Sequence, residues 1–277
     1  MLVLSLTLLS TTGIMAQDDD DEPTADELYE LAYNEYLDGN YETAIDEFTN
    51  ALEVDSTLAS AYFYRALSNY NLGNADESMI SDLTSAIEYE FFDIPWAHNI
   101  RGLTHARMGN YEDAIVDYTE ALALSSTYAI VYRNRSIAYQ ALGDWASAAT
   151  DSKTSLEIDP DRTGAYNSVA WIYVQLGRYE DALGYISVEL ERNPDLNFAL
   201  DTLGWAYLGL GQYFDAITTF ERAIELDEEY SYYGLGVAYN QLGTDSIAIE
   251  NLETYIDIYG DDAEQDAIDL LAELQGE

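Results

Sequence analysis

The stretch LGRYEDA at residues 176–182 decides the fold, because near-copies of it recur along the chain. Residues 108–114 read MGNYEDA, and residues 210–216 read LGQYFDA. The glycines of this pattern are Gly39, Gly73, Gly109, Gly143, Gly177, Gly211 and Gly243, at spacings of 34, 36, 34, 34, 34 and 32 residues. A period near 34 residues indicates stacked repeats, each too small to bury its own apolar face.

The apolar pattern of residues 163–196 predicts two helices per repeat. Tyr166, Val169, Ala170 and Tyr173 recur at i, i+3, i+4 and i+7, which is the apolar face of one helix. Gly177 can adopt the left-handed conformation that ends this helix, and a second apolar pattern follows it. In other repeats the residue after the glycine is suited to cap the second helix: Asn40, Asn74, Asn110 or Asp144.

This pattern resembles the tetratricopeptide repeat family. Its characteristic residues are most complete as Leu203, Gly204, Tyr207, Gly211, Tyr213, Ala216, Phe220 and Ala223. The resemblance implies an all-α, right-handed superhelical solenoid of about seven repeats, at 25–58, 59–94, 95–128, 129–162, 163–196, 197–228 and 229–260. Residues 261–277 are expected to form a capping helix that shields the last repeat, with Ala267, Leu270, Leu271 and Leu274 on one face.

Two junctions depart from the regular spacing. Residues 59–94 have Ala75 and Ser78 where the family has tyrosine and alanine, followed by the irregular stretch 90–95. The 36-residue spacing predicts a bulge or longer turn there, and we expect this repeat to be locally the least stable. At 227–229 the sequence Asp-Glu-Glu replaces a longer turn and shortens the spacing to 32 residues.

The composition is strongly acidic, with 53 acidic and 10 basic residues for a net charge of −43. This balance argues against binding to nucleic acid or to an anionic membrane surface. Two interpretations of the acidity stay open: adaptation to a high-salt or cation-rich habitat, and a generally solubilising surface. The absence of cysteine excludes disulfides, thiolate metal sites and cysteine nucleophiles.

The N-terminal sequence resembles an export signal. Residues 1–16 combine a short apolar run with Ala16 before a cleavage site, although the usual basic segment is missing, so either the start lies upstream or the signal is weak. The run is too short to span a bilayer, and residues 17–24 would form an acidic, flexible N-terminus. We therefore expect a periplasmic or extracellular protein whose mature chain is not inserted in a membrane.

Arginine and aspartate occupy matching places in three successive repeats, and both are replaced in the three repeats that follow. The arginines are Arg65, Arg101 and Arg135, and the aspartates are Asp82, Asp117 and Asp151. In the next three repeats Val169, Leu203 and Leu235 replace the arginines, while Tyr185, Thr219 and Asn251 replace the aspartates. Because the two types appear and vanish together, we predict structural ion pairs between packed helices rather than catalytic groups.

No motif predicts chemistry. The two histidines, His98 and His105, would lie about 10 Å apart on one helix, too far to share a metal ion at Zn–N distances of roughly 2.1 Å, so we interpret them as core residues. The chain lacks the nucleophile elbow, the Walker phosphate loop and the dinucleotide fingerprint. We expect no catalytic residue, cofactor or metal, and no enzymatic activity.

In the tetratricopeptide family, the first helix of each repeat lines a concave groove at set places. In this chain those places hold Tyr29, Tyr33, Tyr36, Phe63, Tyr70, Trp96, Asn99, Arg133, Asn167, Trp171, Phe198, Asp201, Trp205, Tyr230 and Tyr233, with Arg107 beside them. Large aromatic residues with few charges are typical of binding hot spots. The alternative is that several of them, such as Tyr33, Trp171 and Trp205, pack against the neighbouring repeat. No groove place holds a lysine, so the carboxylate clamp of one branch of the family is not expected.

These observations favour a non-catalytic protein-interaction scaffold that binds a peptide or helix of a partner in the aromatic groove. A second hypothesis is a structural or assembly component of the cell envelope that uses its outer surface and ends. A third, an acidic cation-binding protein or enzyme, finds no supporting motif. Fold alone does not choose the partner.

Overall fold

The computed structural model describes residues 23–276, which form helices joined by short turns, with no strand in this range. The expected signal peptide and most of the acidic segment at 17–24 lie outside the described residues. In chain order the helices are α1 (Ala25–Leu37), α2 (Tyr41–Val54), α3 (Ala59–Asn71), α4 (Glu77–Glu88), α5 (Ile94–Arg107), α6 (Tyr111–Leu124), α7 (Ala129–Ala141), α8 (Trp145–Ile158), α9 (Ala165–Gln175), α10 (Tyr179–Arg192), α11 (Asn197–Gly209), α12 (Tyr213–Glu225), α13 (Ser231–Gln241), α14 (Asp245–Tyr259), the short 3₁₀ helix η1 (Gly260–Asp262) and α15 (Gln265–Gln275).

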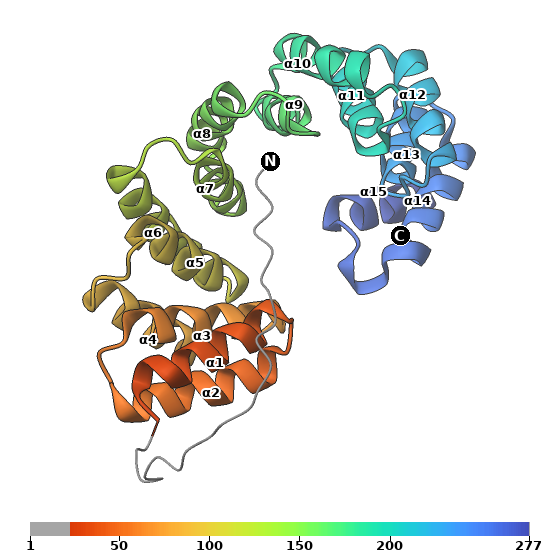
Figure 1. Ribbon diagram of the computed structural model, residues 1–277. Coiled ribbons are helices and arrows are strands. Elements are labelled where there is room, and N and C mark those ends of the chain that lie inside the picture. Colours follow the sequence, from red (N-terminus) through yellow and green to blue (C-terminus); the bar gives the residue numbers. More distant parts are fainter. Residues whose placement is uncertain (1–22, 277) are drawn as a thin grey trace, which may run out of the picture.

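Helices α1 to α14 pair in sequence, and the pairs stack into a curved solenoid (Figure 1). The odd-numbered helices from α3 to α11 line the inner side of the arc, and the even-numbered helices from α4 to α12 lie outside them (Figure 1). Gly177 ends α9 with a φ of +67°, so the turn glycine has the left-handed conformation that its pattern predicts. The fold is therefore an all-α repeat solenoid, as the spacing of the glycines predicts.

Each helix pair depends on a small residue of the first helix facing a bulky residue of the second. A Cβ atom at Gly102 would lie 2.7 Å from the Tyr118 ring, and one at Gly204 would lie 2.5 Å from the Phe220 ring. Both distances are shorter than van der Waals contact, so only glycine fits these two places. The other repeats have Ala32, Ala66, Ser136, Ala170 and Gly236 at the same place, all buried. This periodic small residue lets the paired helices approach closely.

The two irregular junctions share one backbone feature. Glu90 and Asp227 have φ values of +59° and +65°, and no other non-glycine residue in the described range has a positive φ. At the first junction the inserted residues place Phe91 in the core, where its ring stacks on Phe63 with centroids 4.1 Å apart. A turn residue in the left-handed region therefore marks both changes of spacing.

The N-cap prediction is only partly correct. Asn40, Asn110 and Asp144 occupy the N-cap positions of α2, α6 and α8, but only Asp144 accepts a hydrogen bond through its side chain, from the Ser147 amide. Asn74 is not a cap, because α4 begins two residues late relative to the pattern and Asp76 caps it instead. The shift follows from the irregular sequence of this repeat.

Helix α15 covers the end of the solenoid. Its Ala267 is fully buried with Leu252 and Tyr255 of α14, and its three leucines pack around them. Figure 1 shows α15 on the inner side of the arc, beside α13. The last helix therefore shields the final repeat and also brings its acidic N-terminus to the concave side.

Candidate partner-binding groove

The structure brings together each arginine and aspartate that the sequence pairs. The shortest Arg–Asp contacts are 2.6 Å for Arg65 with Asp82, 2.7 Å for Arg101 with Asp117 and 2.6 Å for Arg135 with Asp151. The pairs are bidentate, and the aspartates are almost completely buried. They link the two helices of one repeat, and their fork geometry is that of strong charge-assisted hydrogen bonds.

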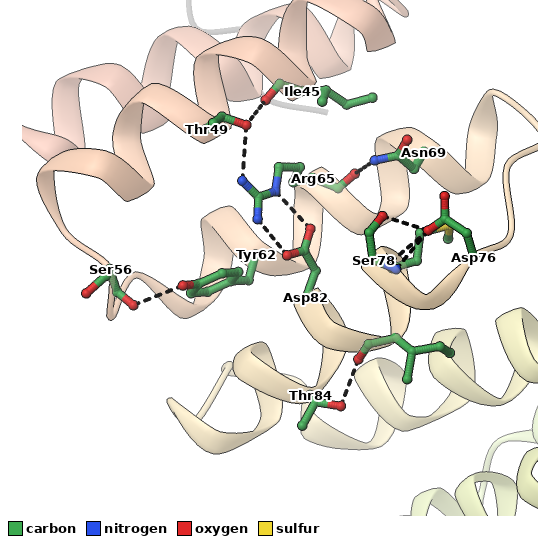
Figure 2. A network of polar contacts seen from close by, with 12 residues as sticks. Ile45, Thr49, Ser56, Tyr62, Arg65, Asn69, Asp76, Ser78, Asp82 and Thr84 are labelled. Carbon is green, nitrogen blue, oxygen red and sulfur yellow. Dashed lines mark hydrogen bonds and ion pairs between the residues drawn. The ribbon is translucent and has the colours of Figure 1, made fainter.

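Each of these arginines also reaches back to the preceding repeat. The third contact goes from the guanidinium to a threonine hydroxyl: Thr49 for Arg65, Thr84 for Arg101 and Thr119 for Arg135, at 3.1, 2.9 and 2.9 Å. Figure 2 shows Arg65 between Thr49 and Asp82, with the Thr49 hydroxyl donating to the Ile45 carbonyl. We call this Asp–Arg–Thr unit an arginine clasp. The threonines were missed at the sequence level, although they recur at one place of consecutive second helices.

The clasps stop after α8, where the core becomes apolar. Val169 and Leu235, which replace the arginine, are both buried in hydrophobic clusters. Tyr185 replaces the aspartate and stacks on Tyr173 with ring centroids 5.5 Å apart. The arginine clasps therefore add to apolar packing in the N-terminal half of the solenoid and are absent from the C-terminal half.

His98 and His105 both face Asp117 from the same helix. The His98 Nδ1 atom lies 2.9 Å from the Asp117 carboxylate, and the His105 Nε2 atom lies 3.9 Å from it. Burial alone would raise the pKa of Asp117, but the hydrogen bonds from His98 and Arg101 outweigh it and hold the pKa below its ordinary value. The histidines thus belong to the second clasp. Within residues 23–276, no group of three or more metal-binding side chains comes together.

The predicted groove tyrosines of α1 pack on one another. Tyr29, Tyr33 and Tyr36 form a stack, and the Tyr64 ring of α3 closes it with its centroid 4.8 Å from that of Tyr33. Burial raises the pKa of Tyr29 to about 12. These three rings are half-buried in the first core cluster, so most of their surface already serves packing between repeats.

Three predicted groove residues lie behind the surface. Phe63 is buried by Phe91, and Asn99 is fully buried and accepts a hydrogen bond from Asn134 of α7 at 3.0 Å. Asp201 is only 7% exposed, and the Ser231 hydroxyl donates to it at 2.6 Å. The family places do not distinguish these residues from surface ones, because the turn after α4 covers Phe63 and the next repeat covers Asn99 and Asp201. The prediction that they line an accessible groove is wrong.

The remaining groove residues differ in their freedom to bind. The Arg107 guanidinium lies over the Tyr70 ring, 3.5 Å from its centroid, and donates a hydrogen bond to the Tyr70 carbonyl. The two residues therefore already use each other as binding partners. Trp96 packs edge-on against Tyr128, and Phe198 is partly exposed beside Gly164. The N-terminal half of the predicted groove therefore offers little unoccupied aromatic surface.

The groove opens on the C-terminal half of the inner face. A cavity of about 420 Å³ lies between α8, α9, α11, α13 and α15, and aromatic rings form its walls. They belong to Trp145, Trp171, Trp205, Tyr230 and Tyr233. Glu264 and Asp266 at the start of α15 also line it. We call this cavity the tryptophan pocket, and its volume is in the range of ligand sites in proteins.

The tryptophan pocket continues toward the middle of the solenoid. A neighbouring cavity of about 200 Å³ is lined by Arg133 and Ile137 of α7 and by Asn167 and Trp171 of α9. Because Trp171 lines both cavities, the two adjoin. Arg133 forms no ion pair with another described residue, and the buried Asn167 Oδ1 atom has no hydrogen-bond partner among them.

A buried glutamate fixes the helix that lies between the two cavities. The Glu189 carboxylate of α10 accepts hydrogen bonds from the Gly164, Tyr166 and Asn167 amides at 3.0, 3.1 and 3.4 Å. These amides belong to the unpaired N-terminus of α9, where a negative charge is stabilising. Glu189 therefore positions α9, and with it Asn167 and Trp171, from the outer layer.

The potential inside the tryptophan pocket is negative. Burial raises the pKa of Tyr233 to about 12, and the charges of Asp266 and Glu264 add to the shift. Behind the rings, burial raises the pKa of Asp201 to about 7. None of the residues that line the pocket is basic, and the chain has no lysine or arginine after Arg222. The site thus combines aromatic walls with uncompensated carboxylates.

Four residues that line this pocket are absent from the predicted groove: Trp145, Gln175, Glu264 and Asp266. Trp145 begins α8, an outer helix, and no family place marks the first residue of a second helix as facing the groove. Glu264 and Asp266 were read only as part of a capping helix. Their place depends on how α15 folds back to the inner side, which no local pattern specifies.

The comparisons with known proteins agree with this architecture. Three models of the tetratricopeptide repeat match the chain, at residues 95–128, at 198–230, and at 29–91 with 133–197. These stretches leave only short gaps between residues 29 and 230. The chain belongs to the tetratricopeptide repeat family. The proteins of this family are generally non-catalytic scaffolds for contacts between proteins.

Two curated proteins share part of this tetratricopeptide array. The human tetratricopeptide repeat protein 6 is 29% identical over 113 residues, 39% of this chain and 20% of that protein. A DnaJ homolog subfamily C member 7 homolog from Dictyostelium discoideum is 34% identical over 106 residues, 36% of this chain and 19% of that protein. The match spans about a fifth of the length of each relative, so their activities do not transfer as findings.

Solved tetratricopeptide structures show the same fold at low identity. A tetratricopeptide repeat protein from Parabacteroides merdae matches with a TM-score of 0.69 and 17% identity, over 91% of this chain and 99% of that one. YrrB, described as a tetratricopeptide protein with an unusual peptide-binding site, matches with a TM-score of 0.52 and 22% identity, over 70% of this chain and 98% of that one.

Within residues 23–276, none of the helices has the length and apolar character of a membrane span.

Proposed function

We propose that this protein is a non-catalytic scaffold that binds an extended peptide or a helix of a partner protein in the C-terminal half of its concave groove. The observation that supports this most is the tryptophan pocket, where three of the four tryptophans of the chain gather around one cavity. Aromatic residues in pockets at the centre of a surface are typical of binding hot spots.

Two further features support the groove over the outer surface. Trp205 and Tyr233 contact each other edge-on at 5.2 Å, so the pocket wall is preformed and little ordering is needed on binding. The adjoining cavity extends the surface along α7 and α9, as an elongated ligand requires. YrrB, which has a related fold, is described as binding a peptide.

The rival proposal is an assembly component of the cell envelope that uses the outer face. Phe214 of α12 is 75% exposed and Phe92 before α5 is 78% exposed, so the outer side and the turns also present aromatic side chains. These residues lie far apart in the sequence and line no described cavity together with other aromatics. They serve best as the control surface in a binding test.

The test is a selection of displayed random peptides on the folded protein, followed by titration of the enriched peptides. We expect Trp171→Ala with Trp205→Ala to weaken binding by more than tenfold, which is the size of a hot-spot loss. Gln175→Trp should do the same by filling the pocket without removing a packed side chain, since Gln175 is exposed and lines it.

The matched control is Phe214→Ala, which removes an exposed outer ring. It should leave the affinity unchanged. Circular dichroism melts of every variant identify any loss that comes from unfolding. Peptides whose affinity is insensitive to Gln175→Trp but falls with Phe214→Ala would contradict groove binding and support the outer surface.

We also propose that the protein acts outside the cytoplasm. The support is the apolar run and Ala16 within residues 1–16. Expression of the full chain with a C-terminal tag, followed by fractionation and N-terminal sequencing, is expected to give an exported form that begins near residue 17. An intact chain confined to the cytoplasm would contradict this proposal.

A further inference from the structure

The tryptophan pocket has a chemistry that selects its ligand. Its walls are the faces and edges of tryptophan and tyrosine rings, and two of the other residues lining it are the carboxylates Glu264 and Asp266. Rings of this kind attract cations through their electron-rich faces, with tryptophan the strongest. Carboxylates beside such rings add a direct charge partner.

No cation among residues 23–276 pairs with these carboxylates. None of the residues that line the pocket is basic, and the last basic residue in the sequence is Arg222. Arg222 is paired elsewhere, with Asp195 at 2.8 Å and Glu225 at 3.1 Å.

Buried aspartates have arginine partners in the N-terminal half of the molecule but not in the C-terminal half. In the N-terminal half, each buried aspartate at the clasp place has its own arginine, as Asp151 has Arg135. In the C-terminal half, the buried Asp201 has no arginine partner, and the Ser231 hydroxyl donates a hydrogen bond to it at 2.6 Å. Glu264 and Asp266 likewise line the tryptophan pocket with no basic residue beside them.

Building on the function proposed above, we propose that the tryptophan pocket binds an arginine side chain of a basic segment in the partner protein. The guanidinium would stack on the tryptophan and tyrosine rings while its edge pairs with Glu264 or Asp266. Arginine suits the site better than lysine, because its planar group both stacks on rings and pairs bidentately with carboxylates. The net charge of −43 would speed association with a basic partner.

The indole N–H signals of the four tryptophans provide the test. The probes are capped heptapeptides of sequence GSGXGSG with arginine, lysine, norleucine or glutamate at X, titrated to about 10 mM so that millimolar binding is detected. We expect the arginine peptide to shift the signals of Trp145, Trp171 and Trp205, and to leave that of Trp96 unchanged. The glutamate and norleucine peptides should shift none of them.

Matched charge variants locate the carboxylates that act. Glu264→Gln with Asp266→Asn should weaken arginine-peptide binding by roughly fivefold, the size of an exposed ion pair. Asp261→Asn with Asp262→Asn changes the net charge equally, at exposed neighbouring positions that do not line the pocket, and should leave binding unchanged. Equal weakening by both pairs would show a general charge effect and overturn the proposal.

The failure of this inference is separable from that of the proposed function. If selected peptides lose affinity in Gln175→Trp but the arginine peptide shifts no pocket tryptophan, the groove binds a partner and the arginine proposal is wrong. If selected peptides are indifferent to Gln175→Trp, both proposals are wrong.

Discussion

At the scale of single residues, the arginine clasps are the clearest case in which the contribution of one side chain to stability depends on another. Arg135 is joined to Asp151 and Thr119, and unlike Arg101 it has no histidine on its aspartate. Removing one partner of a buried pair leaves an uncompensated charge, whereas replacing both by apolar residues can be nearly neutral. In the C-terminal repeats Val169 and Leu235 occupy the arginine place within apolar clusters, so that place accepts an apolar side chain.

We therefore expect Arg135→Met to cost about 3 kcal/mol of unfolding free energy, and Asp151→Leu a similar amount. The double variant should recover most of this loss, as chemical denaturation of the four proteins would measure. For Arg101 and Asp117 the recovery should be smaller, because His98 loses its partner in Asp117→Leu. Simple additivity at Arg135 and Asp151 would show that the clasp is not a coupled unit.

The buried Asp201 makes a second prediction at this scale. Its pKa is raised to about 7 by burial, whereas the unfolded carboxyl titrates near its ordinary 3.8. Between these values the native state holds a proton that the unfolded state has released, so this group costs stability progressively as the pH rises toward 7. Asp201→Asn removes that cost and keeps an acceptor for the Ser231 hydroxyl.

The difference in unfolding free energy between Asp201→Asn and the unchanged protein should grow by up to about 3 kcal/mol from pH 5 to pH 8. Urea denaturation across this range measures it. Glu221→Gln, at an exposed position of α12, controls for the loss of one negative charge. A difference that stays constant with pH would mean that Asp201 is ionised throughout.

At the scale of elements, the irregular junctions show where the chain departs from a regular repeat. Glu90 follows α4 in the left-handed region, which costs a residue with a side chain roughly 1–2 kcal/mol. A glycine at this position avoids that steric cost. Part of the gain in stability is lost, because glycine also gives the unfolded chain more conformational freedom.

Glu90→Gly should therefore raise the unfolding free energy by about 0.5–1 kcal/mol. Glu88→Gly, two residues earlier and at the end of α4, should lower it by about 1 kcal/mol. Thermal melts of the two variants check the sign. If both lower the stability, the turn at Glu90 is not strained.

The sequence specifies the elements well because each repeat is short and its contacts are nearly all with neighbouring helices. Glycine spacing and apolar periodicity predict the helix pairs, and the alternation of arginine with leucine or valine predicts which charges meet. The groove is less predictable. Asn99 and Asp201 occupy the same places as exposed residues, and only the approach of the next helix buries them. Glu264 and Trp145 enter the pocket through the curvature of the whole array.

At the scale of the whole molecule, the net charge of −43 makes repulsion between exposed carboxylates the main electrostatic effect on stability. Exposed like charges repel one another over a Debye length of about 10 Å at 0.1 M salt, and this falls to about 3 Å at 1 M. We expect the melting temperature to rise by several degrees from 0.05 to about 1 M NaCl, whereas an equal osmolality of sucrose should account for only part of the rise. A melting temperature that is indifferent to NaCl would contradict both the repulsion and the proposed adaptation to salt.

The two halves of the solenoid differ in how their carboxylates are paired. Its N-terminal half balances buried carboxylates with arginines. Its C-terminal half leaves carboxylates and rings facing the concave side, where α15 closes the tryptophan pocket.

The most direct test of this account is the structure of the full chain bound to an arginine-containing peptide obtained by selection. We expect the peptide to lie along α9, α11 and α13, with a guanidinium between Trp171 or Trp205 and the carboxylate of Glu264 or Asp266. A peptide seated on the outer face of α10 and α12, with the tryptophan pocket open, would contradict it.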